Sequence, residues 1–100
     1  MEGKEYVDRM ACLLELGYTR PEAEQAAAKI ERMAPQLLEQ LDRWFRTGSL
    51  PEEEYGGFTV SELVEERGFM VPAAFLYLDW LIKDPEAAKA ALADMADGFL

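Results

Sequence analysis

Apolar residues recur along this chain at spacings of three and four positions, and no stretch alternates long enough to form a strand. The first such stripe covers residues 4–16, where Tyr6, Met10 and Leu13 fall on one face of a helix. Gly17 follows directly. Because glycine readily takes the left-handed backbone that ends many helices, we expect this helix to stop there.

The next two helices have recognisable ends. Thr19 and Glu22 form a capping-box pattern that opens a second helix, and the Ala34-Pro35 step closes it. The inner face of this helix is small and mostly alanine, consisting of Ala23, Ala26, Ala27, Ile30 and Met33. Pro35 begins a third helix, and Thr47-Gly48-Ser49 ends it. Its apolar stripe is Leu37, Leu38, Leu41, Trp44 and Phe45. Residues 50–57 contain proline, three glutamates and two glycines, and therefore predict an acidic linker.

Three more helices are predicted after the linker. Thr59 and Glu62 form a second capping box, which opens a short helix that carries Leu63 and Val64 inward and ends near Gly68. Residues 72–82 are apolar nearly all round, which indicates a helix buried on most sides at the centre of the fold. Asp84 and Pro85 open the last helix. We expect it to end at Gly98 and to have the inner face Ala87, Ala88, Ala91, Leu92 and Met95.

These elements predict one all-α domain over residues 1–100, a compact bundle of five to six short helices. A length of 100 residues fits one domain with its own core. The linker divides the chain into halves, residues 1–49 and 58–100. Because each half alone would be marginal in stability, we expect the halves to pack together.

Charge and composition exclude several classes of function. Twenty acidic residues against ten basic ones give a net charge of −10, and no two basic residues are adjacent, so we expect no direct contact with nucleic acid or membrane. The chain has no histidine and one cysteine, Cys12, which we interpret as a small core residue. Residues 1–5 are polar and lack the apolar region of a signal peptide, which favours a cytoplasmic protein. No residue pattern calls for a metal, a cofactor or a catalytic nucleophile with its base, and we expect no enzyme activity.

Two acidic features allow a functional interpretation. Asp79 lies in the most apolar helix, where it is either a general acid with a raised pKa or a carboxylate that reaches solvent or pairs with Arg43, Arg46 or Arg67. Six glutamates lie between Pro51 and Arg67 with no basic residue among them: Glu52, Glu53, Glu54, Glu62, Glu65 and Glu66. They are either a solvated surface or a mimic of nucleic-acid phosphates that fits a basic groove. The spacing does not match a calcium loop.

The chain carries more aromatic residues than one small core needs, and some of them are candidates for an interface. Tyr55 and Phe58, on either side of two glycines, form the aromatic pair that we expect to be exposed. A homodimer through the Trp44/Phe45 face or the Tyr77/Trp80 face stays open at this point.

The segment from Leu13 to Ala26 resembles ubiquitin-associated (UBA) domains, which are three-helix modules. In that family a Met-Gly-Phe/Tyr loop follows the first helix, and here Leu16-Gly17-Tyr18 stands in its place. The resemblance covers residues 6–45, and it implies a three-helix unit that uses this loop together with apolar residues late in the third helix to contact ubiquitin. The Leu37-Leu38 pair lies early in the predicted third helix. UBA-like folds also serve as general docking modules that do not bind ubiquitin. The resemblance therefore implies the three-helix fold first, and ubiquitin as the ligand only second. The second half of the chain resembles no family.

The sequence thus favours a small acidic, non-catalytic protein-interaction module. Its partner would be another protein that is basic or has an apolar groove. The alternative is an acidic nucleic-acid mimic that inhibits a basic nucleic-acid-binding enzyme, as anti-restriction or anti-CRISPR proteins of phages and mobile elements do. The apolar candidates for partner binding are Leu16, Tyr18, Tyr55 and Phe58, and the acidic candidates are the six glutamates named above.

Overall fold

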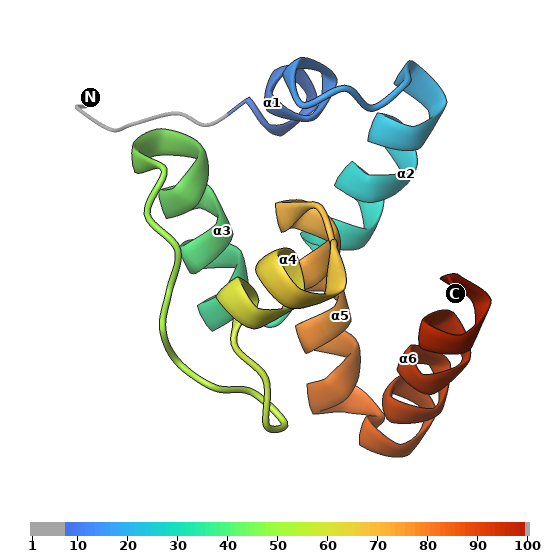
Figure 1. Cartoon of the computed structure of the whole chain (residues 1–100). Helices are drawn as coiled ribbons and strands as arrows, with labels where there is room; N and C mark the ends of the chain where they lie inside the picture. Colours follow the sequence, from blue (N-terminus) through green and yellow to red (C-terminus); the bar gives the residue numbers. More distant parts are fainter. Residues whose placement is uncertain (1–7, 100) are drawn as a thin grey trace. The chain divides into compact units, whose positions relative to one another are not determined.

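The computed structural model describes the backbone of residues 8–99 and the side chains of residues 8–94 (Figure 1). It contains six helices and no named strand in that part of the chain, which confirms the all-α prediction. The chain divides into two units, Met1–Ser49 and Leu50–Leu100.

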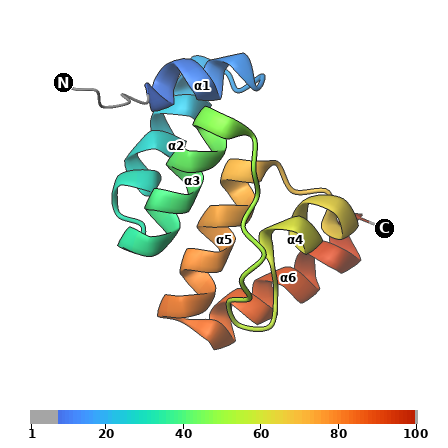
Figure 2. The same ribbon diagram turned by 90° about the vertical axis from the view of Figure 1, so that its left-hand side faces the viewer.

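The first unit holds three helices, α1 (Arg9–Glu15), α2 (Arg20–Glu31) and α3 (Pro35–Thr47). Helix α1 packs against both α2 and α3 (Figure 2). The apolar stripes predicted from the sequence supply the buried side chains Leu13, Ala23, Ile30, Met33, Leu37 and Leu41. Residues Ala26, Ala27, Leu38, Trp44 and Phe45 of the same stripes are half-buried.

The end of α1 follows from Gly17, as predicted. Gly17 has φ +109°, and its amide donates to the Leu14 carbonyl while the Tyr18 amide donates to the Leu13 carbonyl. This pair of bonds is a Schellman motif, which satisfies carbonyls that the helix itself leaves open. At its start, α1 is capped by the Asp8 carboxylate, which accepts from the Ala11 amide at 3.1 Å. Residues 4–7 of the predicted helix lie outside the described residues.

Helices α2 and α3 have the predicted ends. The capping box of α2 is complete, because Thr19 accepts from the Glu22 amide while Glu22 accepts from the Thr19 amide. The last helical residue of α2 is Glu31, three positions before Ala34. Pro35 begins α3, and Gly48 ends it with φ +79°.

The second unit begins with an extended segment that closes into a tight turn. The backbones of Tyr55 and Phe58 exchange two hydrogen bonds of 2.8 and 3.1 Å across Gly56 and Gly57, both of which have positive φ. A Cβ at Gly56 would approach the Leu81 side chain to 3.3 Å, so the turn needs glycine there for space as well as for backbone conformation. Part of the predicted linker is therefore an ordered turn against α5.

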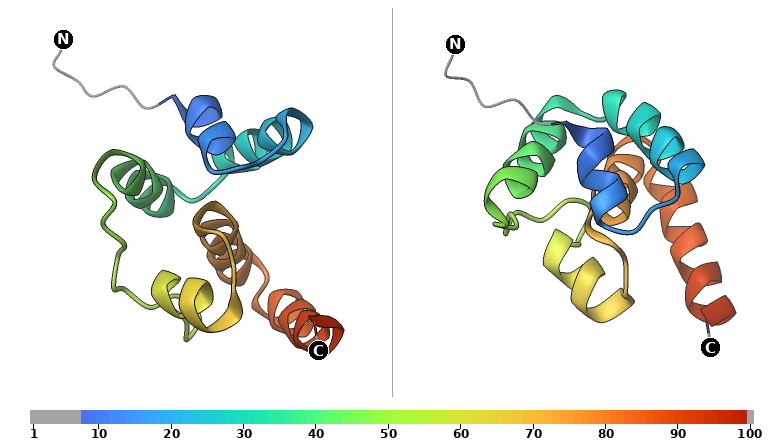
Figure 3. Two further views of the ribbon diagram at one scale, coloured as in Figure 1. Left: turned by 45° about the horizontal axis from the view of Figure 1, so that its top comes forward. Right: turned by 90° about the horizontal axis from the view of Figure 1, so that it is seen from above.

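The remaining helices are α4 (Val60–Arg67), α5 (Val71–Lys83) and α6 (Pro85–Phe99). Helix α5 packs against both α4 and α6 (Figure 3), so it is central to this unit. The second capping box at Thr59 is present, and Gly68 ends α4 with φ +77°. The buried side chains of this unit include Val60, Leu63, Phe75, Leu78, Ala88 and Leu92, whereas Val64, Ala87 and Ala91 are half-buried.

The prediction that α6 ends at Gly98 is wrong, because the helix continues to Phe99. Glycine in a helix costs about 1 kcal/mol relative to alanine, and that is too little to end a helix by itself. The start of α6 is as predicted, since the Asp84 carboxylate accepts from the Ala87 amide at 3.3 Å. The predicted inward position of Met95 lies outside the described side chains.

Candidate functional site

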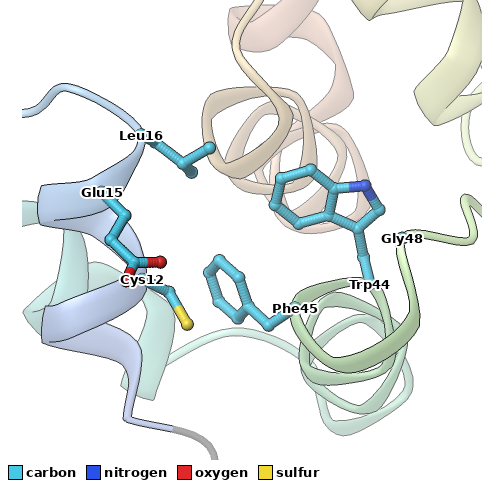
Figure 4. A pocket seen from close by; sticks show the side chains of 6 residues that line it. All are labelled: Cys12, Glu15, Leu16, Trp44, Phe45 and Gly48. Carbon is cyan, nitrogen blue, oxygen red and sulfur yellow. The ribbon is translucent and has the colours of Figure 1, made fainter.

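The first unit carries a pocket of about 350 Å³ where the end of α1 faces the end of α3 (Figure 4). We call it the α1–α3 pocket. Its lining consists of Cys12, Glu15 and Leu16 from α1 and its cap, and Trp44, Phe45 and Gly48 from α3 and its cap. The side chains in Figure 4 converge on the space between the two helices.

Helical spacing puts these residues on facing sides of the two helices. Cys12, Glu15 and Leu16 are separated by three and four positions, which places them on one face of α1. Trp44 and Gly48 are four positions apart on α3, and Gly48 has no side chain to fill the opening.

An ion pair joins the two walls of the pocket. The Arg9 guanidinium donates from Nε to Asp42 Oδ1 at 2.9 Å and from Nη2 to Asp42 Oδ2 at 2.7 Å. Both side chains are partly buried, with exposed fractions of 29% and 19%. A bidentate pair of this kind fixes geometry as well as adding energy, so it holds α1 and α3 in register.

The aromatic wall of the pocket is the pair Trp44 and Phe45. The ring centroids lie 5.4 Å apart and the ring planes are inclined by 51°. Both residues are half-buried, and both line the pocket. Leu16, which is 37% exposed, adds an apolar side chain opposite them.

The Cys12 thiol in the pocket is not activated as a nucleophile. Desolvation raises the pKa of the Cys12 thiol, and the negative charges of Glu15, Asp8 and Asp42 raise it further. The thiol is therefore protonated at neutral pH, whereas the thiolate is the nucleophilic form. Cys12 is half-buried, which agrees with its interpretation as a packing residue.

Of the apolar residues predicted to bind a partner, Leu16 lies in the pocket and Tyr18 does not. Tyr18 is half-buried beside the end of α1, where its amide completes the Schellman motif. Burial raises the pKa of its hydroxyl, and the negative charge of Glu22 adds to this. Tyr18 therefore shapes the loop, whereas Leu16 is the loop residue that lines the pocket.

The expectation that Tyr55 and Phe58 form an exposed pair is wrong, because both are half-buried in the second unit. The Phe58 ring packs edge-on against Tyr77 at 6.3 Å between centroids, and the Phe69 ring packs against Tyr77 at 5.7 Å. The Tyr77 hydroxyl in turn donates to the Ala88 carbonyl at 2.8 Å. Buried hydroxyl groups need such a partner. Through these contacts Phe58 and Phe69 pack against Tyr77, which is a core residue.

Five of the six acidic candidates are exposed: Glu52, Glu53, Glu54, Glu65 and Glu66. Glu62 is instead engaged in the capping box of α4, where its carboxylate accepts from the Thr59 amide at 2.8 Å. Glu62 therefore acts as part of the helix cap, which the sequence pattern itself contained. No group of three potential metal-ligating side chains occurs among the described residues.

Asp79 is buried, with 8% of its surface exposed, and it pairs with a residue that the sequence analysis did not name. Its carboxylate lies 2.8 Å from Lys83 Nζ, one turn along α5. A pairing of Asp79 with Arg43, Arg46 or Arg67 stays a prediction. An i, i+4 lysine that is half exposed brings a cation to a buried carboxylate at little cost in desolvation.

Most of the pocket is therefore not apparent from the amino-acid pattern. The pattern predicts Cys12 as a core residue, and Trp44 and Phe45 as stripe residues or a dimer face. It assigns no role to Glu15, and to Gly48 only that of ending the helix. The helical spacing of each set was readable, but which faces meet depends on the packing of α1 on α3.

None of the helices in the described part of the chain is long and apolar enough to cross a membrane. Comparison of the chain with models of protein families, with curated proteins and with solved structures finds no match.

Proposed function

We propose that this chain is a small, non-catalytic protein-interaction module and that the α1–α3 pocket is its docking site. The observation that carries the proposal is the meeting of Leu16, from the loop after α1, with Trp44 and Phe45, late in α3. Aromatic side chains in partly open pockets are the groups that most often dominate binding energy at interfaces.

The resemblance to UBA domains supports the same surface. In that family the loop after the first helix acts together with apolar residues late in the third helix. Leu37 and Leu38 lie early in α3, whereas Trp44 and Phe45 lie in its last turn. The proposal takes over this docking geometry and leaves the identity of the partner open. The single cysteine, which has no second cysteine in this sequence to pair with, fits a module that works in a reducing compartment such as the cytoplasm.

The test is affinity capture of partners from the source cells with three tagged variants beside the wild type. Trp44→Ala removes the aromatic wall, and Leu16→Glu places a charge at the apolar edge. Trp80→Ala is the matched control, because this tryptophan is 41% exposed and belongs to the second unit. Circular dichroism establishes that each variant is folded.

We expect the first two variants to lose at least about tenfold in captured partner, which corresponds to the loss of one interfacial hot spot. The control should retain the partner. The proposal is wrong when Trp44→Ala and Leu16→Glu capture the same proteins as the wild type in the same amounts.

A second candidate is the nucleic-acid mimic, which is favoured by the exposure of five glutamates in the second unit. It needs a dense set of carboxylates that face a basic groove. Its discriminating experiment is the reversal of these charges to lysine.

A further inference from the structure

The α1–α3 pocket has a chemical asymmetry that bears on what it binds. Its lining combines two aromatic rings and a leucine with one charged side chain, Glu15. In Figure 4 the Glu15 carboxylate lies across the pocket from the rings. A purely apolar occupant would leave this carboxylate next to an apolar group.

Glu15 makes no ion pair or hydrogen bond with any residue in the described part of the chain. The cation nearest in sequence on α1, Arg9, is held by Asp42 in the bidentate pair described above. The negative charge of Glu15, together with those of Asp8 and Asp42, also raises the pKa of the neighbouring Cys12 thiol. The lining of the pocket therefore carries one negative charge, that of Glu15, and no cation.

The size of the pocket limits the occupant. Binding sites for small ligands span about 300–1,000 Å³, and this pocket, at about 350 Å³, is at the lower end. It is large enough for one long side chain and too small for a helix laid along a groove.

Resting on the proposed function, we propose that the α1–α3 pocket takes an arginine side chain of a basic partner protein. Its guanidinium stacks on the Trp44 ring and pairs with the Glu15 carboxylate, while its methylene groups contact Phe45 and Leu16. Both interactions belong to one planar group, because a guanidinium stacks on aromatic faces and donates hydrogen bonds from its edge at the same time.

Lysine satisfies this pocket less well. Its ammonium is a compact, strongly hydrated charge, so lying over an indole costs it more desolvation than a guanidinium. The net charge of −10 adds a long-range effect, because it raises the rate at which basic partners arrive.

The test is a titration followed by NMR amide and indole shifts, with three probes: the acetylated amides of arginine, citrulline and leucine. Citrulline has the shape of arginine and no charge. We expect saturable shifts at the Trp44 indole and at pocket amides with the arginine probe, and binding at least about fivefold weaker with the citrulline probe. Substituting Trp44 by Phe identifies the indole signal.

Two variants separate the role of Glu15 from that of net charge. Glu15→Gln should weaken binding of the arginine probe at least about fivefold and leave the citrulline probe unchanged. Glu31→Gln makes the same change in net charge at an exposed position of α2 outside the pocket lining, and it should leave both probes unchanged.

The inference is overturned when the arginine probe gives no saturable shift or binds no better than citrulline. It is also overturned when Glu15→Gln has no effect, or when the leucine probe binds more tightly than arginine. The last result leaves the proposed function intact, because the pocket would then dock an apolar side chain. The proposed function has its own test, and unchanged capture by Trp44→Ala and Leu16→Glu would show that it is wrong.

Discussion

At the scale of the residue, the pKa of the Cys12 thiol depends on the charges around the α1–α3 pocket. Burial and three acidic neighbours raise the pKa of its thiol. A raised pKa means that less thiolate is present at any given pH, so alkylation by iodoacetamide should be slower than for a free thiol at pH 8 and should increase with pH to a midpoint above the ordinary value.

Substituting Glu15 by Gln removes one of the charges that raise this pKa. The midpoint of the rate profile should therefore move downward, and the alkylation rate at pH 8 should rise. Glu31→Gln provides the control for net charge. An unchanged pH profile in Glu15→Gln would show that the negative charge of Glu15 does not act on the Cys12 thiol.

A second residue-scale prediction concerns the buried carboxylate of α5. Asp79 lies 2.8 Å from Lys83 and is 8% exposed, whereas half of the Lys83 side chain reaches solvent. Such a pair lies between a surface ion pair, which contributes little, and a fully buried one. We expect a double-mutant cycle of Asp79→Asn and Lys83→Met to give a coupling free energy of about 1–2 kcal/mol.

The cycle is measured by urea unfolding of the four proteins. Methionine keeps most of the aliphatic chain of lysine, so the cycle isolates the charge interaction from the packing of that chain. If the effects of the two single substitutions add up to that of the double substitution within about 0.5 kcal/mol, Lys83 contributes nothing to holding Asp79 in place.

At the scale of the element, the loop after α1 depends on Gly17. Its φ of +109° is unfavourable for a residue with a Cβ, although nothing lies within 4 Å of where that Cβ would stand. The cost of Gly17→Ala is therefore backbone strain alone. We expect it to lower the free energy of unfolding by about 1–2 kcal/mol in urea denaturation.

Asparagine tolerates positive φ better than alanine, so Gly17→Asn should lose less stability than Gly17→Ala. The arginine probe should likewise bind more weakly to Gly17→Ala than to Gly17→Asn, because the Schellman motif positions Leu16 at the pocket. A variant Gly17→Ala that is as stable as the wild type would contradict the role assigned to the left-handed cap.

Helix ends were predictable from the sequence because their signals are local. The capping boxes at Thr19 and Thr59 join residues three positions apart, and glycines such as Gly17 act within one turn. The failure at Gly98 has the same origin: a glycine permits an end and does not impose one.

The pocket could not be predicted in this way. Its walls are held by Arg9 and Asp42, which are 33 positions apart, and no local pattern marks that pair. Likewise, Tyr55 and Phe58 were expected at the surface from their glycine-rich turn, and the contact that half-buries Phe58 comes from Tyr77 in α5. Periodicity predicts which residues share a face, whereas the partner of that face is a tertiary property.

At the scale of the whole molecule, the net charge of −10 is compatible with either function. It attracts basic proteins whether the decisive contact is an aromatic pocket or a row of carboxylates. Its general effect is on the association rate, which salt reduces for both. Salt dependence alone therefore does not separate the two functions, and the position of the charge has to be varied at constant net charge.

Two triple reversals achieve this. Glu52, Glu53 and Glu54 changed to Lys remove the exposed acidic segment of the second unit, and Glu24, Glu31 and Glu39 changed to Lys alter the net charge equally in the first unit. If docking occurs at the α1–α3 pocket, both triple variants should reduce capture of the partner by a similar factor. The reason is that both weaken the long-range electrostatic attraction of a basic partner equally. If the chain mimics nucleic acid, the first triple alone should abolish capture, since a basic groove would then face lysines. Equal effects of the two triples, together with a strong effect of Trp44→Ala, would leave the pocket as the site of recognition.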